Sequence, residues 1–172
     1  MGTRLIKRVL LMSVNEQDFK NALKLWASGV TVVTAKTEAH GLKGMTATSF
    51  SSVSIDPPQI LVCINKSADT GDAVLEGKTF AINILKADQQ EISNQFAGSA
   101  SQEERFANVN WHQGETGSPV IDDALASIEC SVVQQVQAGT HWVVIGEVQK
   151  VSCRSGNPLL YYNSAYCELA AN

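Results

Sequence analysis

Apolar and polar residues alternate over several segments of the chain, and this period of two is typical of half-buried β-strands. The clearest case is Ala126–Val132. Here we expect Ala126, Ile128, Cys130 and Val132 to face inward and Ser127, Glu129 and Ser131 to face outward. Runs of β-branched and apolar residues predict further strands at Val30–Thr37, Gln59–Asn65, Thr79–Leu85, His141–Cys153 and Leu159–Tyr162. Gly146, inside the longest of these, indicates a bulge or a closely packed neighbour.

A helical period replaces this alternation near the N-terminus. One apolar face, at positions i, i+3, i+4 and i+7, is formed by Phe19, Ala22, Leu23 and Trp26. Asn15 is a suitable N-cap, and Ser28–Gly29 provides a C-terminal stop. We therefore expect a helix that buries this face and places Trp26 in the core. Shorter helices are expected at Thr70–Gly77 and Ala87–Ala97, the second ending at Gly98.

Glycine and proline mark the turns between the predicted strands. His40–Gly41 would reverse the chain between Val30–Thr37 and a second strand formed by Gly41–Ser54. Asp56–Pro58 would break that strand, because neither proline can donate a backbone hydrogen bond. Further turns are predicted at Ala138–Thr140 and, as a hairpin, at Arg154–Asn157.

The pattern amounts to about seven closely spaced strands with two or three helices between them. It favours an antiparallel barrel, mainly β with flanking helices, over a parallel doubly wound sheet. Residues 15–172 would form a single domain, and residues 1–14 a flexible N-terminal leader. Ser99–Asp123 follows neither period, and we expect a long surface loop there.

Composition and charge then narrow the functional classes. The chain has 172 residues, 44% of them hydrophobic and 17% charged, which is typical of a soluble globular protein. A net charge of −4 without a basic block argues against nucleic-acid binding, and the apolar runs are too short to cross a membrane. Cys63, Cys130, Cys153 and Cys167 are widely spaced, so we expect them to be reduced and structural, with Cys63 buried, in a cytoplasmic protein. The histidines lack the spacing of metal ligands, so no metal is expected.

Candidate chemistry is concentrated in Gly41–Ser54. Between Thr46 and Ser54 this stretch carries six hydroxyl side chains and no charged residue. Short hydroxyl side chains let a ligand approach the backbone, and they rotate to donate or accept hydrogen bonds. Such a surface suits a flat polar molecule with a phosphate at one end. An ordinary strand rich in threonine and serine, exposed on one face, fits the same composition, and both interpretations remain open.

Several common catalytic motifs are missing from the sequence. It has no glycine-rich dinucleotide fingerprint and no Walker loop, and the hydroxyl groups of the stretch lack the partners of a nucleophilic triad. We therefore expect no catalytic side chain. A ligand site of this kind suits a reaction whose chemistry is carried by a cofactor.

A series of short motifs covers nearly the whole chain, from about residue 15 to residue 166. Its first members are Trp26–Thr34, Gly44–Val53, Asp56–Pro58, Cys63–Ser67, Phe80–Leu85 and Phe96–Gly98. They are followed by Arg105–Phe106, Gly117–Pro119, Gly139–His141, Gly146–Val148 and Pro158–Tyr161. In this order the motifs resemble the short-chain flavin reductase family, the reductase components of two-component flavin-dependent monooxygenases. The family fold is an FMN-binding split β-barrel, usually homodimeric, which agrees with the predicted barrel. The residues before Asn15 and the bulky Trp142 depart from the family pattern.

The resemblance implies a flavin site with its ring and ribityl chain against Met45–Ser49, where hydroxyl and backbone N–H groups would face the ring. Asn65–Ser67 would meet the phosphate, with Lys66 supplying the charge, and Phe96–Gly98 would close over the flavin tail. The implied cofactor-binding residues are Met45, Thr46, Ala47, Thr48, Ser49, Ser52, Asn65, Lys66, Ser67, Phe96, Ala97, Gly98 and Arg105, and the implied nicotinamide contact is His141.

Ordinary structural roles remain open for some of these residues. Lys66 fits a solvated surface lysine, and Asn65 fits a cap for the helix that follows. Arg105 fits a purely structural arginine, and His141 fits the exposed start of a strand.

For function, the resemblance implies that NADH or NADPH reduces bound FMN or FAD. Reduced flavin would then pass to a separate oxygenase, acting on an aromatic or phenolic compound, and the reductase would be a homodimer. The alternative is a split-barrel protein that holds flavin as an electron carrier or sensor. The sequence leaves open which flavin and which nicotinamide are used, and which oxygenase is served.

Overall fold

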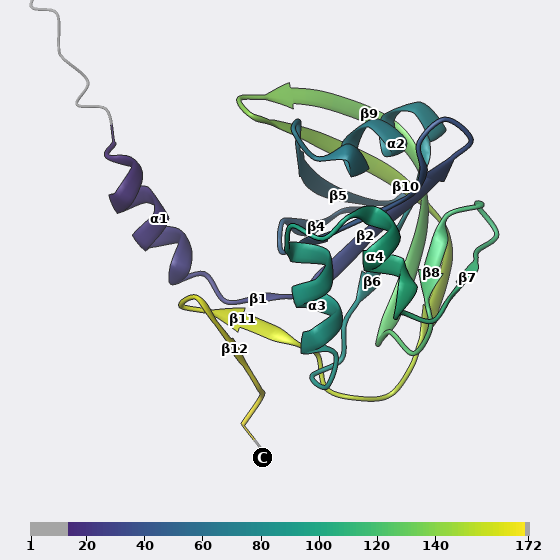
Figure 1. Cartoon of the computed structure of the whole chain (residues 1–172). Coiled ribbons are helices and arrows are strands. Elements are labelled where there is room, and N and C mark those ends of the chain that lie inside the picture. The colour runs from purple at the N-terminus through teal and green to yellow at the C-terminus, as the bar shows by residue number, and fades with distance from the viewer. Residues whose placement is uncertain (1–13, 171–172) are drawn as a thin grey trace, which may run out of the picture.

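The computed structural model describes residues 14–170 and is mainly β (Figure 1). Among these residues, seven strands form one antiparallel sheet. In spatial order they are β3 (Gly41–Ala47), β2 (Thr31–Thr37), β6 (Thr79–Ile84), β9 (Ala126–Ala138), β10 (His141–Cys153), β5 (Pro58–Asn65) and β4 (Phe50–Ile55). The edge strands β3 and β4 are consecutive in the chain, so the sheet curls into a split barrel. The predicted fold class is confirmed.

Helices and two small sheets surround the barrel (Figure 1). The helices are α1 (Glu16–Lys24), α2 (Asp69–Gly77), α3 (Gln90–Ala97) and α4 (Gln102–Ala107). One small sheet contains β1 (Ser28–Gly29), β11 (Leu160–Tyr162) and β12 (Ala165–Cys167), and the other contains β7 (Trp111–Gln113) and β8 (Pro119–Ile121). Within residues 14–170 no helix is long and apolar enough to cross a membrane. Apart from Val14, the predicted leader lies outside the described residues.

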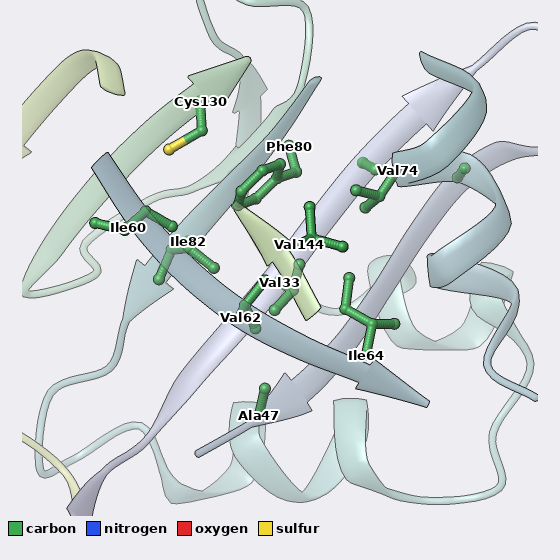
Figure 2. Packing of buried hydrophobic residues seen from close by; sticks show 12 residues of the cluster. Val33, Ala47, Ile60, Val62, Ile64, Val74, Phe80, Ile82, Cys130 and Val144 are labelled. Carbon is green, nitrogen blue, oxygen red and sulfur yellow. The ribbon is translucent and has the colours of Figure 1, made fainter. Parts of the chain in front are cut away.

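The main core fills the barrel between β2, β5, β6, β10 and α2, with side chains such as Val33, Val62 and Phe80 pointing into it (Figure 2). Gly146 is part of this packing. A Cβ atom there would lie 2.6 Å from Phe80 Cζ, and the register with β9 shifts between Ile145 and Gly146. Both predictions for Gly146, a bulge and a close neighbour, are therefore confirmed. Burial raises the pKa of the Cys130 thiol to about 12, so this cysteine stays protonated and is no nucleophile.

A fully buried amide joins four strands of the fold. Asn83 Nδ2 donates to Val32 O at 3.2 Å and Thr34 Oγ1 at 3.1 Å. Its Oδ1 accepts from Ile121 N at 2.9 Å and Ser127 Oγ at 3.1 Å. The side chain thus links β6 to β2, β8 and β9, and every polar atom of the amide has a partner. Such a network stabilises one arrangement of the strands, because any other leaves buried polar groups unpaired.

The outward positions predicted on β9 are partly wrong. Ser127 and Glu129 are buried, because the β7–β8 hairpin covers this face of the sheet. Glu129 Oε2 accepts hydrogen bonds from Thr116 N at 2.8 Å and Thr116 Oγ1 at 2.9 Å. A Cβ atom at Gly114 would lie 2.4 Å from this carboxylate, so the hairpin loop packs directly on Glu129. A carboxylate that satisfies backbone and hydroxyl donors can be buried where alternation alone predicts exposure.

Helix α1 forms as predicted at its start, where Asn15 Oδ1 accepts from Gln17 N at 2.8 Å. It ends at Lys24, earlier than predicted, and Ser28–Gly29 is a strand rather than a helix stop. The expectation that this helix packs on the core is wrong. None of its residues is buried in the described part of the chain, and Trp26 is 75% exposed. Helix α1 lies before β1 in the chain and stands apart from the barrel, so its apolar face does not reach the core (Figure 1).

Three other predicted segments also differ. Gly41–Ser54 forms two strands, because the chain breaks at Thr48–Ser49 between β3 and β4. Ser99–Asp123 contains α4 and the β7–β8 pair, so it is not a plain loop. Helix α4 begins with a capping box, in which hydrogen bonds from Ser101 to the Glu104 carboxylate lower the pKa of Glu104. The last strand that the sequence predicted is β11, and it pairs with β1 and β12, so Arg154–Asn157 does not join a hairpin.

Candidate functional site

Four neighbouring cavities form a continuous groove beside the end of β3. The central cavity, of about 300 Å³, is lined by Met45–Thr48, Ala68, Phe96, Ala97 and Arg105. It shares Ala68 and Arg105 with the polar cavity, of about 340 Å³, whose other lining residues are Ser67, Asp69, Thr70 and Ser99–Gln102. The predicted hydroxyl-rich segment and the predicted phosphate segment therefore meet along one surface.

On its other side the central cavity continues into two aromatic cavities. The tyrosine cavity, of about 380 Å³, shares Thr46, Thr48 and Ala97 with it and is lined further by Val30, Ser93, Asn94, Tyr161 and Ser164–Tyr166. The Trp26 cavity, of about 510 Å³, shares Thr48, Tyr161 and Ser164 with the tyrosine cavity. Its other lining residues are Lys20, Leu23, Lys24, Trp26, Ser28, Ser49 and Asn163.

Hydrogen bonds tie the walls of the groove together. Thr46 Oγ1 donates to Ser93 O at 2.6 Å, which joins β3 to α3. The Tyr166 hydroxyl lies 2.8 Å from both Ser93 Oγ and Asn94 Oδ1, which joins β12 to the same helix. Tyr161 packs edge-on against Tyr166 with 5.4 Å between ring centroids. The wall of the tyrosine cavity is thus fixed from three elements that are far apart in the sequence.

Gly44 allows β3 to lie directly on α3. A Cβ atom at this position would lie 2.4 Å from Phe96 Cε1. Phe96 itself is buried and packs edge-on against Phe106, with 5.1 Å between ring centroids. Phe96 therefore forms the floor of the central cavity from within the core. Any side chain at residue 44 would push the two elements apart and change the shape of the groove.

Arg105 holds the junction between the central and polar cavities. Its guanidinium donates to Gly44 O at 2.7 Å, Gly98 O at 2.6 Å and Ala100 O at 3.1 Å. A guanidinium has five N–H donors and keeps its positive charge at any ordinary pH. Three donors are thus used on carbonyl groups, while the charge remains beside both cavities. Arg105 is structural and also lies where an anion would bind, so both of its predicted roles are compatible.

The polar cavity has the features of an anion site. It adjoins the N-terminus of α2, where the N-cap is Ala68, a residue with no polar side chain. Thr70 is 1% exposed, and its Oγ1 has no hydrogen-bond partner among residues 14–170. Free N–H groups and the helix dipole both favour a negative charge at this position. Arg105 adds a full positive charge, and the Asp69 carboxylate on the same wall is offset by Lys43 Nζ at 3.6 Å.

Most of the predicted cofactor residues line this groove. In the central and polar cavities they are Met45, Thr46, Ala47, Thr48, Ser67, Phe96, Ala97 and Arg105, and in the Trp26 cavity Ser49. Gly98 contributes a carbonyl group to Arg105 instead. Ser52 is on the exposed edge strand β4 and lines none of these four cavities. Cys63, predicted to be buried, is half-buried and pairs with Ser49 through backbone and hydroxyl hydrogen bonds.

The remaining predicted residues form a second group at the start of β10. His141 pairs with Asn65 across the β10–β5 ladder, and its Nδ1 lies 2.9 Å from Thr140 Oγ1. Asn65 Oδ1 accepts from Ser67 N and Ser67 Oγ, each at 3.0 Å, in a turn that precedes α2. The N-cap of α2 is Ala68 and no side chain caps this helix, so the capping role left open for Asn65 is wrong. Lys66 Nζ lies 5.6 Å from the centroid of the Trp142 ring. None of His141, Asn65 and Lys66 lines the four cavities of the groove.

Sequence reasoning missed several lining residues. Thr70, Tyr161, Tyr166, Trp26 and Lys24 line the groove from elements that were predicted to lie elsewhere or to have no role. The serine at 101 followed three residues later by glutamate was a signal for the start of α4, but nothing local placed this helix beside the site. Within residues 14–170, no group of three or more His, Cys, Asp or Glu side chains is placed to hold a metal ion.

Comparisons with known proteins bear on the whole chain. Residues 23–170 match the family described as "Flavin reductase like domain". The chain is 39% identical, over 92% of its length and 89% of the relative, to the FMN reductase (NADH) RutF of Pseudomonas syringae pv. syringae strain B728a. Nitrilotriacetate monooxygenase component B from Mycobacterium thermoresistibile is 34% identical with a TM-score of 0.84, covering 90% of this chain and 86% of that one. BorF, the flavin reductase component of a bacterial two-component tryptophan halogenase, is 31% identical with a TM-score of 0.84, covering 92% and 100%.

Proposed function

Because the chain belongs to the flavin reductase like domain family, as its motifs predicted, we propose that it reduces FMN or FAD with NADH or NADPH. The observation that supports this most strongly is the groove itself. It has an anion site at one end and an uncharged wall rich in hydroxyl groups beside it, which matches the shape and polarity of a flavin mononucleotide. The chain contributes binding and orientation, and a bound flavin supplies the atom that accepts the hydride.

The 5′-phosphate of the flavin fits the polar cavity. Thr70 Oγ1 is buried and unpaired among the described residues, and it could donate a hydrogen bond to a phosphate oxygen. The free N–H groups at the start of α2 and the guanidinium of Arg105 would add donors and positive charge. Ser67 lines the same cavity, as predicted for a phosphate contact. Lys66 is two positions before Ala68, the N-cap, and in our proposal contributes charge to this end of the groove from its place over Trp142.

The flavin ring and ribityl chain would lie along Met45–Ser49. Thr46 Oγ1 already donates to Ser93 O, so this hydroxyl would offer the ligand its lone pairs. Thr48 lines three of the four cavities and is the residue placed to contact a ligand anywhere along the middle of the groove. Donors near a flavin ring stabilise the negative charge that develops on reduction. No acidic or basic side chain of the chain is required for hydride transfer in this proposal.

The names of related proteins suggest which protein would receive the reduced flavin. One solved neighbour is named as component B of a nitrilotriacetate monooxygenase, and another as the flavin reductase component of a two-component tryptophan halogenase. We propose the same arrangement here, with a separate flavin-dependent oxygenase, acting on an aromatic or phenolic compound, that receives reduced flavin by diffusion. The alternative is a protein that retains its flavin as an electron carrier or sensor.

The test of this function is NADH oxidation by purified protein, with and without added FMN or FAD. We expect negligible NADH loss without flavin and steady turnover with it, because the wall proposed for the flavin ring, Met45–Thr48, offers only neutral groups and would release the flavin readily. A protein that stays yellow through dialysis and gains no NADH oxidation from added flavin would contradict the proposal and favour the carrier. NADPH in a parallel assay identifies the preferred nicotinamide.

We also propose that the chain forms a homodimer through the outer face of β5, β10 and β9. Leu61, Val143 and Ile145 lie on this face and are only half-buried in the single chain, and Val136 beside them is 46% exposed. A contiguous apolar face of this kind favours burial against a partner.

The dimer is tested by light scattering at micromolar concentration. We expect the mass of two chains for the unchanged protein and a shift toward one chain for Val136→Glu, because a buried carboxylate without a partner opposes association. Val151→Glu, at a valine of similar exposure (49%) near the other end of β10, is the control that should leave the mass unchanged. A single-chain mass for the unchanged protein would exclude this dimer.

A further inference from the structure

The edge strand β3 is held at Gly44 by two side chains of α4. In the seven-stranded sheet β3 is the first strand, so no strand of that sheet pairs with its outer side. Gln102 Oε1 accepts from Gly44 N at 2.8 Å, and Arg105 Nη1 donates to Gly44 O at 2.7 Å. The two side chains are three positions apart and therefore lie on the same face of the helix. At this position α4 supplies the hydrogen-bond partners that a further strand would otherwise supply.

This pairing also fixes the orientation of the Gln102 amide. A backbone N–H is a donor, so the atom that meets Gly44 N is the side-chain oxygen, and the NH2 group is left for another acceptor. Within residues 14–170 the Gln102 side chain makes no other hydrogen bond. Gln102 lines the polar cavity together with Arg105 and Thr70, whose hydroxyl is likewise unpaired in this part of the chain. The amide thus brings an unused N–H donor group to the cavity proposed for the phosphate.

Gly44 connects this contact to the wall proposed for the flavin ring. It directly precedes Met45–Thr48, and its backbone packs closely on α3, since a Cβ atom there would lie 2.4 Å from Phe96 Cε1. Two positions further along the strand, the Thr46 hydroxyl is hydrogen-bonded to α3. The start of the wall is therefore set by α4 at Gly44 and by α3 at Thr46. A displacement of Gln102 would reach the wall through Gly44.

We infer that Gln102 is a flavin-binding residue that acts at two places. Its Nε2 donates to the phosphate of the flavin in the polar cavity, and its Oε1 holds Gly44, so one side chain joins the phosphate site to the ring wall. The inference rests on the proposed function, because it takes the polar cavity as the site of the phosphate. A flavin without phosphate would use only the Gly44 half of this arrangement.

FMN and riboflavin differ only in the phosphate, so their affinities for the flavin-free protein separate the two roles. Gln102→Glu keeps an acceptor for Gly44 N and replaces the free NH2 group with a carboxylate oxygen. It is expected to weaken FMN binding about tenfold or more, the effect of losing a hydrogen bond to a charged group, and to change riboflavin binding by no more than about twofold. Gln102→Leu removes both contacts, so it should weaken both ligands, FMN more strongly. Quenching of flavin fluorescence measures each dissociation constant without turnover.

Gln90→Leu is the matched control, because it replaces an exposed glutamine at the start of α3 that lines none of the four cavities. It should leave both affinities unchanged. If Gln102→Glu binds FMN as the unchanged protein does, or loses FMN and riboflavin affinity by equal factors, the amide does not contact the phosphate and the inference is overturned. If Gln102→Leu leaves riboflavin affinity unchanged, Gln102 does not position the ring wall, which also overturns it.

Kinetics provide a readout that a general loss of stability does not reproduce. Gln102→Glu should raise the KM for FMN by the same factor as the dissociation constant and leave kcat at saturating FMN unchanged, because the ring wall keeps its place. A lower kcat with an unchanged KM would overturn the inference. Gln102→Ala replaces Gln102→Leu if the leucine variant does not fold. If the unchanged protein binds neither flavin, the proposed function itself fails, whereas FMN binding that Gln102→Glu does not weaken removes only this inference.

Discussion

Replacing Asn83 with leucine is expected to lower the free energy of unfolding by about 2–5 kcal/mol, although leucine is apolar and similar in size. The amide is fully buried and makes four hydrogen bonds. Leucine would leave Ile121 N and Ser127 Oγ without their acceptor inside the protein. A buried donor that loses its partner costs roughly 1–3 kcal/mol, and the two losses add to the cost of disturbing β8.

Chemical denaturation followed by tryptophan fluorescence measures this change. Gln113→Leu is a suitable control, because it replaces an exposed amide on β7, away from the proposed dimer face, and should shift the free energy of unfolding by no more than about 0.5 kcal/mol. If the two variants unfold at the same denaturant concentration, the Asn83 network does not stabilise the fold as argued here. A denatured Asn83→Leu protein that cannot be purified at all would agree with the prediction, and Asn83→Asp at several pH values would then test the donor half of the amide alone.

Replacing His141 with alanine is expected to lower kcat/KM for NADH roughly 5- to 150-fold while leaving flavin affinity nearly intact. This corresponds to about 1–3 kcal/mol, the cost of one unmade hydrogen bond in a partly dry site. The proposal behind it is that His141 contacts the nicotinamide or its carboxamide. His141 is half-buried, and its ring is oriented by Thr140 Oγ1 at 2.9 Å from Nδ1, so a ligand would meet a ring that is already positioned.

Lys66→Ala is the paired variant, because it should do the reverse and weaken flavin binding more than the NADH dependence. The two residues are close in the structure, since Lys66 N donates to Thr140 O at 3.0 Å. Titrating both variants with each ligand therefore separates two neighbouring sites. A His141→Ala protein that binds flavin poorly and keeps its NADH dependence would show that the nicotinamide is placed wrongly.

Much of the barrel could be predicted from local pattern. The β-branched run at Val30–Thr37 and the apolar run at Gln59–Asn65 became β2 and β5 within a residue or two, because their side chains are buried in the way that their sequence suggests. The capping side chain of Asn15 also depends on a neighbour that sequence reasoning can identify, since it accepts from Gln17 N. Period and turn chemistry act over a few residues, and these predictions needed nothing more.

The wrong predictions concern residues whose burial is decided by tertiary contacts, which the local pattern of apolar and polar residues does not predict. Glu129 was expected outside because it alternates with apolar residues, and it is buried because Thr116, 13 positions earlier in the β7–β8 hairpin, supplies its hydrogen-bond donors. Trp26 was expected inside because it lies on an apolar helical face, and it is exposed because the chain leads α1 away from the barrel. The local spacing of apolar residues predicts neither the position of the hairpin nor the direction of α1.

The candidate site shows the same division. Met45–Thr48 and Arg105 were named in advance, since motifs in family order point to them. Thr70 and Tyr166 were not, because their importance lies in an unpaired hydroxyl and in a hydrogen bond to a helix more than 70 positions away. Residues that act through distant neighbours become visible only when the fold brings the neighbours together.

The two register shifts between β9 and β10 have a consequence for local motion. The shift at Gly146 divides β9 into an inner part, which also pairs with β6, and an outer part whose residues, such as Val136 and Gln137, are exposed. The inner amides can exchange their hydrogens with solvent only when the barrel opens, whereas the outer amides can exchange through fraying of the hairpin end. A single strand should therefore show two exchange rates, with the step near Gly146. In the proposed dimer the outer part is covered, so slow exchange there would follow subunit association and would speed up on dilution.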